Sequence, residues 1–167
     1  MRMDMEFILF DMQDQAMLMS MLPLYQTYEA EISNEALEDI FPPSAFDENF
    51  AYFRGYFEGK TTFICVIDEG YKGFVTFHAD TKERPGHVDG YEGWGHMSEI
   101  YVAKQHRKHG LGKVMVAKAE EELNKLDIKG IYLNDIVGNP HFWKSLNYID
   151  TGIVEPNEGG RVYVKYV

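Results

Sequence analysis

Residues 97–122 restrict the possible folds of this chain more than any other stretch. Ile100, Tyr101 and Val102 favour a strand, because β-branched and aromatic side chains are enriched there. A basic turn over residues 107–112 follows, with two glycines. Apolar residues then recur close to the helical period, at Leu111, Met115, Ala119, Leu123 and Leu126. A glycine-bearing turn that opens a helix presents backbone N–H groups and the positive end of the helix dipole, which together bind phosphate. On the turn alone, an ordinary corner with solvated basic residues explains the pattern equally well.

The rest of the chain alternates between strand and helix patterns. We expect a first strand over residues 6–10 and a helix from Asp14 to about residue 29, which Pro23 kinks or splits. Residues 33–35 are expected to cap a second, short helix, and Asp47 to begin a third. The remaining expected elements are an antiparallel hairpin over residues 61–68 and 73–78, a long glycine-rich loop over 81–95 that is either disordered or functional, a strand over 131–137, a helix over 140–146, and strands over 148–154 and 161–167.

A second motif lies between Asn139 and Tyr148. It reads Asn-Pro-His-Phe-Trp-Lys-Ser-Leu-Asn-Tyr, an asparagine followed by a short helix that begins at Pro140. Asn147 stands where the chain leaves this helix, and asparagine tolerates the left-handed conformation that a helix C-cap requires.

The two motifs together resemble those of the GCN5-related N-acetyltransferase (GNAT) superfamily. The turn matches its pattern Arg/Gln-x-x-Gly-x-Gly/Ala, and the second motif looks like a shortened Asn followed by Phe/Leu-Tyr-x-x-x-Gly-Phe. Trp143 replaces the tyrosine of that pattern, and Asn147 replaces the glycine. The resemblance covers nearly the whole chain. It implies the α/β (α+β) GNAT fold, a mixed and mostly antiparallel sheet of about seven strands, flanked by helices and splayed between strands 4 and 5, in a single domain over residues 1–167.

The resemblance implies that acetyl-CoA is the co-substrate of an acyltransferase reaction. Backbone groups around Ile100, Tyr101 and Val102 would pair with the pantetheine arm, and the Val102 N–H would polarise the thioester carbonyl. The turn would cradle the pyrophosphate. The residues expected there are Arg107, Lys108, His109, Gly110, Leu111, Gly112 and Lys113. In the second motif, Asn139 would hydrogen-bond the same arm, with Phe142 and Trp143 packed beside it.

Glu99 is the candidate catalytic base, since the acceptor amine is protonated near neutral pH and must lose a proton. The alternatives are a structural carboxylate, or one that binds the amine without taking its proton. In the family, the motif tyrosine commonly protonates the departing thiolate. Trp143 offers only an indole N–H donor, so Tyr132, Tyr148 or water must replace it.

The net negative charge of the chain lies in its first third. Residues 3–53 contain eleven acidic residues and no lysine or arginine, while the other sixteen acidic residues balance the sixteen basic ones in the chain. Such a field gathers a cationic ligand or serves only solubility, and it disfavours nucleic acid. We therefore expect a small cationic amine or a basic peptide terminus as acceptor, near Tyr25, Tyr28 and Glu29. The family also allows a homodimer.

Three further features narrow the class of protein. Cys65 is the one cysteine, so no internal disulfide forms, and this suits the cytoplasm. Cys65 lies within an apolar run over residues 63–67, which predicts that it is buried. No apolar run approaches a membrane span in length. The six histidines lack tight metal-ligand spacing and are expected on the surface or in loops, without a metal. They are His78, His87, His96, His106, His109 and His141.

The favoured function is therefore an N-acetyltransferase that transfers acetyl from acetyl-CoA to a primary amine by direct attack in a ternary complex. The alternative is a non-catalytic acyl-CoA-binding or interaction module on the same fold, and Trp143 is its support.

Overall fold

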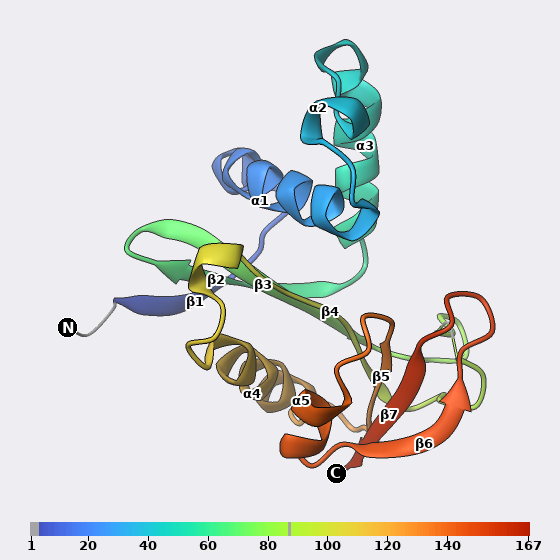
Figure 1. Ribbon diagram of the computed structural model, residues 1–167. Coiled ribbons are helices and arrows are strands. Elements are labelled where there is room, and N and C mark those ends of the chain that lie inside the picture. The colour runs from blue at the N-terminus through green and yellow to red at the C-terminus, as the bar shows by residue number, and fades with distance from the viewer. Residues whose placement is uncertain (1–3, 87) are drawn as a thin grey trace. The chain divides into compact units, whose positions relative to one another are not determined.

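The computed structural model describes residues 4–86 and 88–167. Their strands form one seven-stranded sheet in the order β1-β2-β3-β4-β5-β7-β6 (Figure 1). The strands are β1 (Met5–Leu9), β2 (Thr61–Ile67), β3 (Gly70–Ala79), β4 (Gly95–Val102), β5 (Gly130–Asp135), β6 (Ile149–Val154) and β7 (Arg161–Tyr166). The helices are α1 (Gln15–Ser33), α2 (Leu37–Ile40), α3 (Phe46–Phe57), α4 (Leu111–Leu123) and α5 (Pro140–Ser145), with short 3₁₀ turns η1 (Pro43–Ala45) and η2 (Lys104–His106).

The sheet has the mixed character that the sequence predicted. β1 pairs antiparallel with β2, and β7 pairs antiparallel with both β5 and β6. β4 and β5 are parallel, with Gly95 opposite Ile131 and His96 opposite Tyr132. This short register agrees with the predicted splay between strands 4 and 5. The prediction of a mixed, mostly antiparallel sheet of about seven strands is confirmed.

The chain forms two compact units. The first extends to Val75 and also includes Ile100–Gly112, and the second comprises Thr76–Glu99 and Lys113–Val167. The single domain expected over residues 1–167 stays a prediction.

Aromatic side chains form the core of the first unit. α1 and α3 lie on one face of β1, β2 and β3 (Figure 1). Tyr25 lies at the centre of the cluster, with ring centroids 5.2 Å from Phe53 and 5.7 Å from Phe57. Edge-to-face and tilted geometries of this kind are the favourable ones for aromatic pairs. Cys65 is fully buried in β2, as predicted, and burial raises the pKa of its thiol to about 11.

The first helix begins where the sequence predicted and ends later. The Asp14 carboxylate accepts a hydrogen bond from the Met17 N–H at 3.1 Å, which caps the helix. Asn34 ends it with a φ of 55°. The prediction that residues 33–35 begin a second helix is therefore wrong, since α2 begins after Ala36. Pro23 does not split α1, which runs unbroken from Gln15 to Ser33.

In the second unit, α4 is tied to the last strand. The Lys165 ammonium on β7 donates to the Glu120 carboxylate on α4 at 2.6 Å. Of the apolar positions predicted for this helix, Leu111, Met115, Ala119 and Leu123 are buried, whereas Leu126 lies beyond its end and is exposed. Most other boundaries differ from the prediction by one to three residues.

The long loop between β3 and β4 is held by hydrogen bonds. The Asp80 N–H donates to the Trp94 carbonyl and the Gly93 N–H to the Asp80 carbonyl, each at 2.8 Å. The Tyr91 ring stacks on Tyr132 with centroids 4.4 Å apart. His87 lies outside the described residues.

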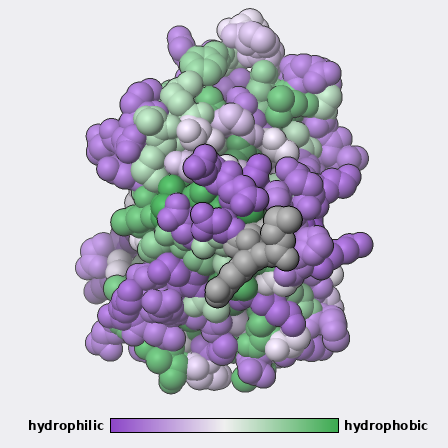
Figure 2. Space-filling view, turned by 90° about the vertical axis from the view of Figure 1, so that its left-hand side faces the viewer, coloured by the Kyte–Doolittle hydropathy of each residue, from purple (hydrophilic) through white to green (hydrophobic). Residues whose placement is uncertain are grey.

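The surface mixes residue types. Figure 2 shows hydrophilic residues spread over the visible face with hydrophobic ones scattered between them. Among the helices described, none combines the length and the hydropathy that a membrane span requires.

Candidate active site

The predicted phosphate-binding turn has an unusual backbone. Lys108 has a φ of 64° and Gly110 a φ of 79°, both in the left-handed region. A side chain is disfavoured there, and a Cβ added to Gly110 would meet no atom of the described residues within 4 Å. α4 begins at the next residue, and the first amides of a helix have no acceptor within the helix. The turn thus leaves open space beside a helix N-terminus.

The Arg107 side chain is held against the first unit. Its Nε donates to the Val102 carbonyl at 2.8 Å, and its Nη2 lies 2.5 Å from the Glu31 carboxylate. The guanidinium also lies over the Tyr101 ring, 5.5 Å from the centroid. Arg107 therefore fixes the start of the turn, and its charge is shared with Glu31. Lys108 and Lys113 are exposed.

Glu31 also contacts Tyr101, the strand residue predicted to contact the cofactor. The Tyr101 hydroxyl donates to Glu31 at 3.1 Å, and its ring packs edge-on against Tyr28. Burial and the Glu31 carboxylate raise the pKa of Tyr101 to about 12, although Arg107 acts in the opposite direction. The Tyr101 side chain is thus engaged, and only its backbone is available for the predicted pairing with the pantetheine amides. Glu99, Ile100 and Val102 are half-buried on the same strand.

A cleft of about 470 Å³ opens in the first unit. It is lined by residues of α1, of the β2–β3 turn and of the segment after β4, with charged groups of both signs; these are Glu31, Glu69, Lys72 and Lys104. The sequence analysis missed Glu31 and Glu69 as site residues. Glu31 lies four residues after Thr27 and eight after Pro23, which also line the cleft, so the helical period was the signal that could have found it.

The three residues predicted to contact the acceptor lie on α1. Tyr25 is fully buried and Tyr28 is 5% exposed, and both belong to the aromatic core. Burial and the Glu29 carboxylate raise the pKa of Tyr25. Glu29 itself is half-buried. We therefore assign the two tyrosines to packing, because an acceptor would reach them only if the core opened. The pattern of aromatic residues alone does not distinguish core from cleft lining.

The second motif forms α5 in the second unit. Asp135, at the end of β5, accepts hydrogen bonds from the Gly138 N–H at 3.1 Å and the Asn139 N–H at 2.7 Å, which fix the turn before the helix. The side chain of Asn139 makes no capping hydrogen bond. Asn147 has a φ of 68°, the left-handed conformation that the sequence predicted.

Aromatic contacts hold the rings of α5 in place. Trp143 packs edge-to-face against Phe142 with centroids 4.9 Å apart and against Tyr148 at 5.4 Å. The Tyr148 hydroxyl is buried without a hydrogen-bond partner among the residues that the structure describes. Burial raises the pKa of Tyr148, with a smaller contribution from Glu120.

Tyr132 is the other candidate acid. It is fully buried, and its hydroxyl donates to Asp80. Burial and this carboxylate raise its pKa. A raised pKa makes both tyrosines, Tyr132 and Tyr148, poorer proton donors than an exposed tyrosine would be.

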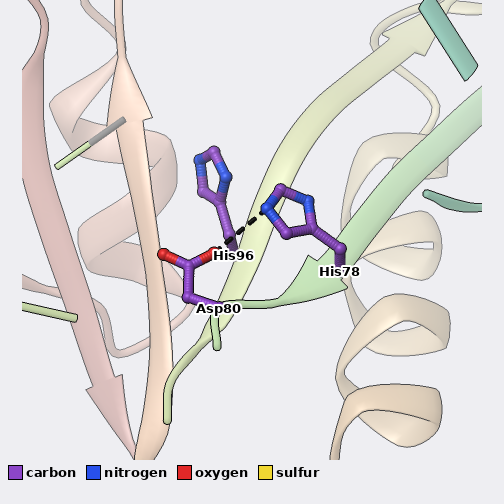
Figure 3. Close-up of side chains that lie close together, drawn as sticks. All are labelled: His78, Asp80 and His96. Atoms are coloured by element: carbon purple, nitrogen blue, oxygen red, sulfur yellow. Dashed lines mark ion pairs between the residues drawn. The ribbon is translucent and has the colours of Figure 1, made fainter. Parts of the chain in front are cut away.

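Two histidines depart from the sequence prediction. His78 lies on β3 and His96 on β4; His96 is 5% exposed, and both stand close to the buried Asp80 (Figure 3). The prediction of surface or loop positions is therefore wrong for these two. Their separation in sequence concealed a proximity that strand pairing creates. His109 and His141 are exposed and His106 is half-buried.

Comparisons with known proteins agree with this fold. A model of the acetyltransferase (GNAT) family matches residues 27–148. No curated protein sequence matches the chain.

Solved structures share the fold at low sequence identity. PH1933 from Pyrococcus horikoshii OT3 superposes with a TM-score of 0.66 at 16% identity, covering 98% of this chain and 99% of that one. The PaiA N-acetyltransferase from Thermoplasma acidophilum, solved with coenzyme A, gives 0.64 at 10% identity over 99% and 100% of the two chains. A GNAT family acetyltransferase from Brucella melitensis, solved with acetyl-CoA, gives 0.62 at 10% identity over 98% and 88%. With a family match over most of its length and the family's fold, this chain belongs to the acetyltransferase (GNAT) family.

Proposed function

We propose that this protein is an acetyl-CoA-dependent N-acetyltransferase that acetylates the primary amine of a small cationic acceptor. The observation that supports this most is the turn between β4 and α4, where two left-handed residues precede a helix N-terminus in a member of an acetyltransferase family. Such a turn suits the pyrophosphate of a CoA thioester. The single cysteine fits a reducing compartment, and we propose the cytoplasm.

Acetyl-CoA would be held by backbone groups more than by side chains. The amides of Gly110, Leu111 and Gly112 would face the pyrophosphate, with His109 beside them and the exposed Lys108 and Lys113 adding positive charge. Arg107 would act mainly by holding the turn, since its guanidinium already pairs with Glu31. The strand backbone at Ile100, Tyr101 and Val102 would pair with the pantetheine amides. Asn139, Phe142 and Trp143 are proposed to contact the same arm of the molecule.

The reaction needs three groups in defined roles. The amine nitrogen attacks the thioester carbonyl, the carbon–sulfur bond breaks, and CoA leaves as its thiolate. Glu99 accepts the proton that the amine loses, directly or through water, and the Val102 N–H stabilises the negative charge on the carbonyl oxygen.

The proton that reaches the thiolate comes from water. Trp143 is not an acid, and the pKa values of Tyr132 and Tyr148 are raised. A CoA thiolate is a tolerable leaving group near neutral pH, so the absence of a dedicated acid lowers the rate without abolishing activity.

The charge of the first unit supports a cationic acceptor. All the acidic residues between positions 4 and 53 are exposed except Glu29. Glu31 and Glu69 line the cleft of that unit. Such a surface raises the local concentration of cations, and screening by salt weakens the effect.

A thiol-release assay with acetyl-CoA over a panel of polyamines, aminoglycosides and basic peptides tests this function. We expect release with at least one cationic amine and a fall of about 10²-fold or more in kcat for Glu99→Gln, which keeps the shape of the side chain but cannot accept the proton. Glu92→Gln is the matched control, an exposed glutamate in the loop before β4.

Two results separate the alternatives. Binding of acetyl-CoA without release for any amine would favour a non-catalytic acyl-CoA-binding module, the reading that Trp143 supports. Release by Glu99→Gln at the wild-type rate would leave the enzyme standing and remove Glu99 from catalysis.

A further inference from the structure

His78, Asp80 and His96 bring three metal-ligating atoms together in the second unit. Figure 3 shows the two imidazole rings beside the carboxylate, from β3, from the residue after β3 and from β4. His78 Nε2 lies 3.0 Å from Asp80 Oδ1, and one ligand atom from each residue lies within 4.8 Å of the other two. Among the described residues, no other group of three has this arrangement.

The chemistry of the three donors suits a divalent transition metal ion. Two imidazoles and one carboxylate are the ligand set of many zinc sites, and imidazole also suits iron, nickel and copper. Metal–ligand bonds of about 2.1 Å place tetrahedral ligands about 3.4 Å apart. The separation between His78 Nε2 and Asp80 Oδ1 is close to that value. A shift of the His96 ligand nitrogen by on the order of 1 Å, within the plane of its ring, would complete the site.

Burial distinguishes these three residues from an ion pair on the protein surface. Asp80 is 2% and His96 is 5% exposed. A buried carboxylate costs free energy unless cations or donors compensate it, and a divalent ion compensates it directly. The loop closes over the carboxylate, because a Cβ added to Gly86 would collide with both Asp80 and the Tyr132 hydroxyl.

The neighbours of the three residues match the outer shell of metal sites. Ligating histidines almost always use the other ring nitrogen in a hydrogen bond, and ligating carboxylates are themselves hydrogen-bonded. His78 Nδ1 lies 3.2 Å from Ser98 Oγ, and the Tyr132 hydroxyl donates to the second oxygen of Asp80. The His96 ring stacks on Tyr132, with centroids 4.5 Å apart and an interplanar angle of 6°.

We propose that His78, Asp80 and His96 bind one first-row divalent transition metal ion, which joins the end of β3 to the start of β4. A fourth position would remain for water. The competing account is a metal-free hydrogen-bond chain from Tyr132 through Asp80 and His78 to Ser98. This chain consists of the contacts Tyr132–Asp80, Asp80–His78 and His78–Ser98. It gives no role to the His96 ring beside the carboxylate.

The test is a metal titration of the full chain without a polyhistidine tag, after treatment with a chelator. Co²⁺ is the spectroscopic probe and Zn²⁺ the competitor. We expect one Co²⁺ per chain with visible absorption bands that Zn²⁺ abolishes. His78→Gln and His96→Gln should each weaken binding by about 100-fold or more, and Tyr132→Phe by about 10- to 100-fold, because Tyr132 orients a ligand. His141→Gln replaces an exposed histidine and should bind as wild type does.

Since substitution of a buried residue can prevent folding, the wild-type chain provides a second measurement. Zn²⁺ should raise its melting temperature with a dependence on concentration that follows the titrated affinity. The proposal is overturned if the wild-type chain binds no Co²⁺ or Zn²⁺ stoichiometrically, which would leave the hydrogen-bond chain as the account. It is also overturned if folded His78→Gln and His96→Gln retain wild-type affinity. Neither result bears on acetyl transfer.

Discussion

Glu31 and Arg107 form the contact that fixes the start of the predicted cofactor turn. Their side chains are 33% and 40% exposed, so water screens much of their attraction. A double-mutant cycle with Glu31→Gln and Arg107→Gln should therefore give a coupling free energy of at most about 1 kcal/mol in urea unfolding. A coupling energy of several kcal/mol would show that the pair is buried in solution.

Cys65 gives the stability of the protein a dependence on alkaline pH. In the folded chain burial raises the pKa of its thiol to about 11, whereas an unfolded thiol ionises from about pH 8.5. Its contribution is complete below pH 8.5 and is lost as pH rises toward 11. Over that window, the free energy of unfolding of the wild type should fall more steeply than that of Cys65→Ala, by at most about 1.4 kcal/mol per pH unit. Equal slopes in denaturant titrations would contradict this assignment.

At the scale of elements, the turn before α4 is the part of the site that one substitution tests best. Gly110→Asp places a negative side chain in open space beside the helix N-terminus, where it would repel a pyrophosphate. We expect calorimetry to give at least about tenfold weaker binding of CoA, or about 1.4 kcal/mol.

Gly159→Asp is the matched control for this substitution. Gly159 has a φ of 81° against 79° for Gly110, and in the part of the chain that the structure describes a Cβ added there also meets no atom within 4 Å. The strain of the two substitutions should therefore be similar. If both variants bound CoA equally well, the turn would be removed from the cofactor site.

The elements that could be predicted are those set by local chemistry. Asp14 caps α1 and Asn147 takes the left-handed conformation because each effect acts within a few residues. The end of α1 could not be predicted in the same way. Serine and asparagine occur both before and after helices, and here Asn34 takes the left-handed conformation that ends α1.

At the scale of the whole molecule, the sequence determined the family and only part of the site. Two motifs of few residues identified the fold, because each joins a turn to a helix at fixed spacing. The cluster of His78, Asp80 and His96 could not be found this way, since it forms only when β3 and β4 become neighbours in the sheet. The burial of Tyr25 could not be predicted either, because a buried ring and an exposed one have the same helical spacing.

The central claim is that the chain transfers acetyl to a cationic amine. The most direct test is mass spectrometry after incubation with isotope-labelled acetyl-CoA and an equimolar mixture of a diamine and an amino alcohol of the same length. We predict labelled acetyl amides, with the diamine favoured about tenfold or more at low salt and less at high salt. Unacetylated amines in the presence of bound acetyl-CoA would contradict the claim.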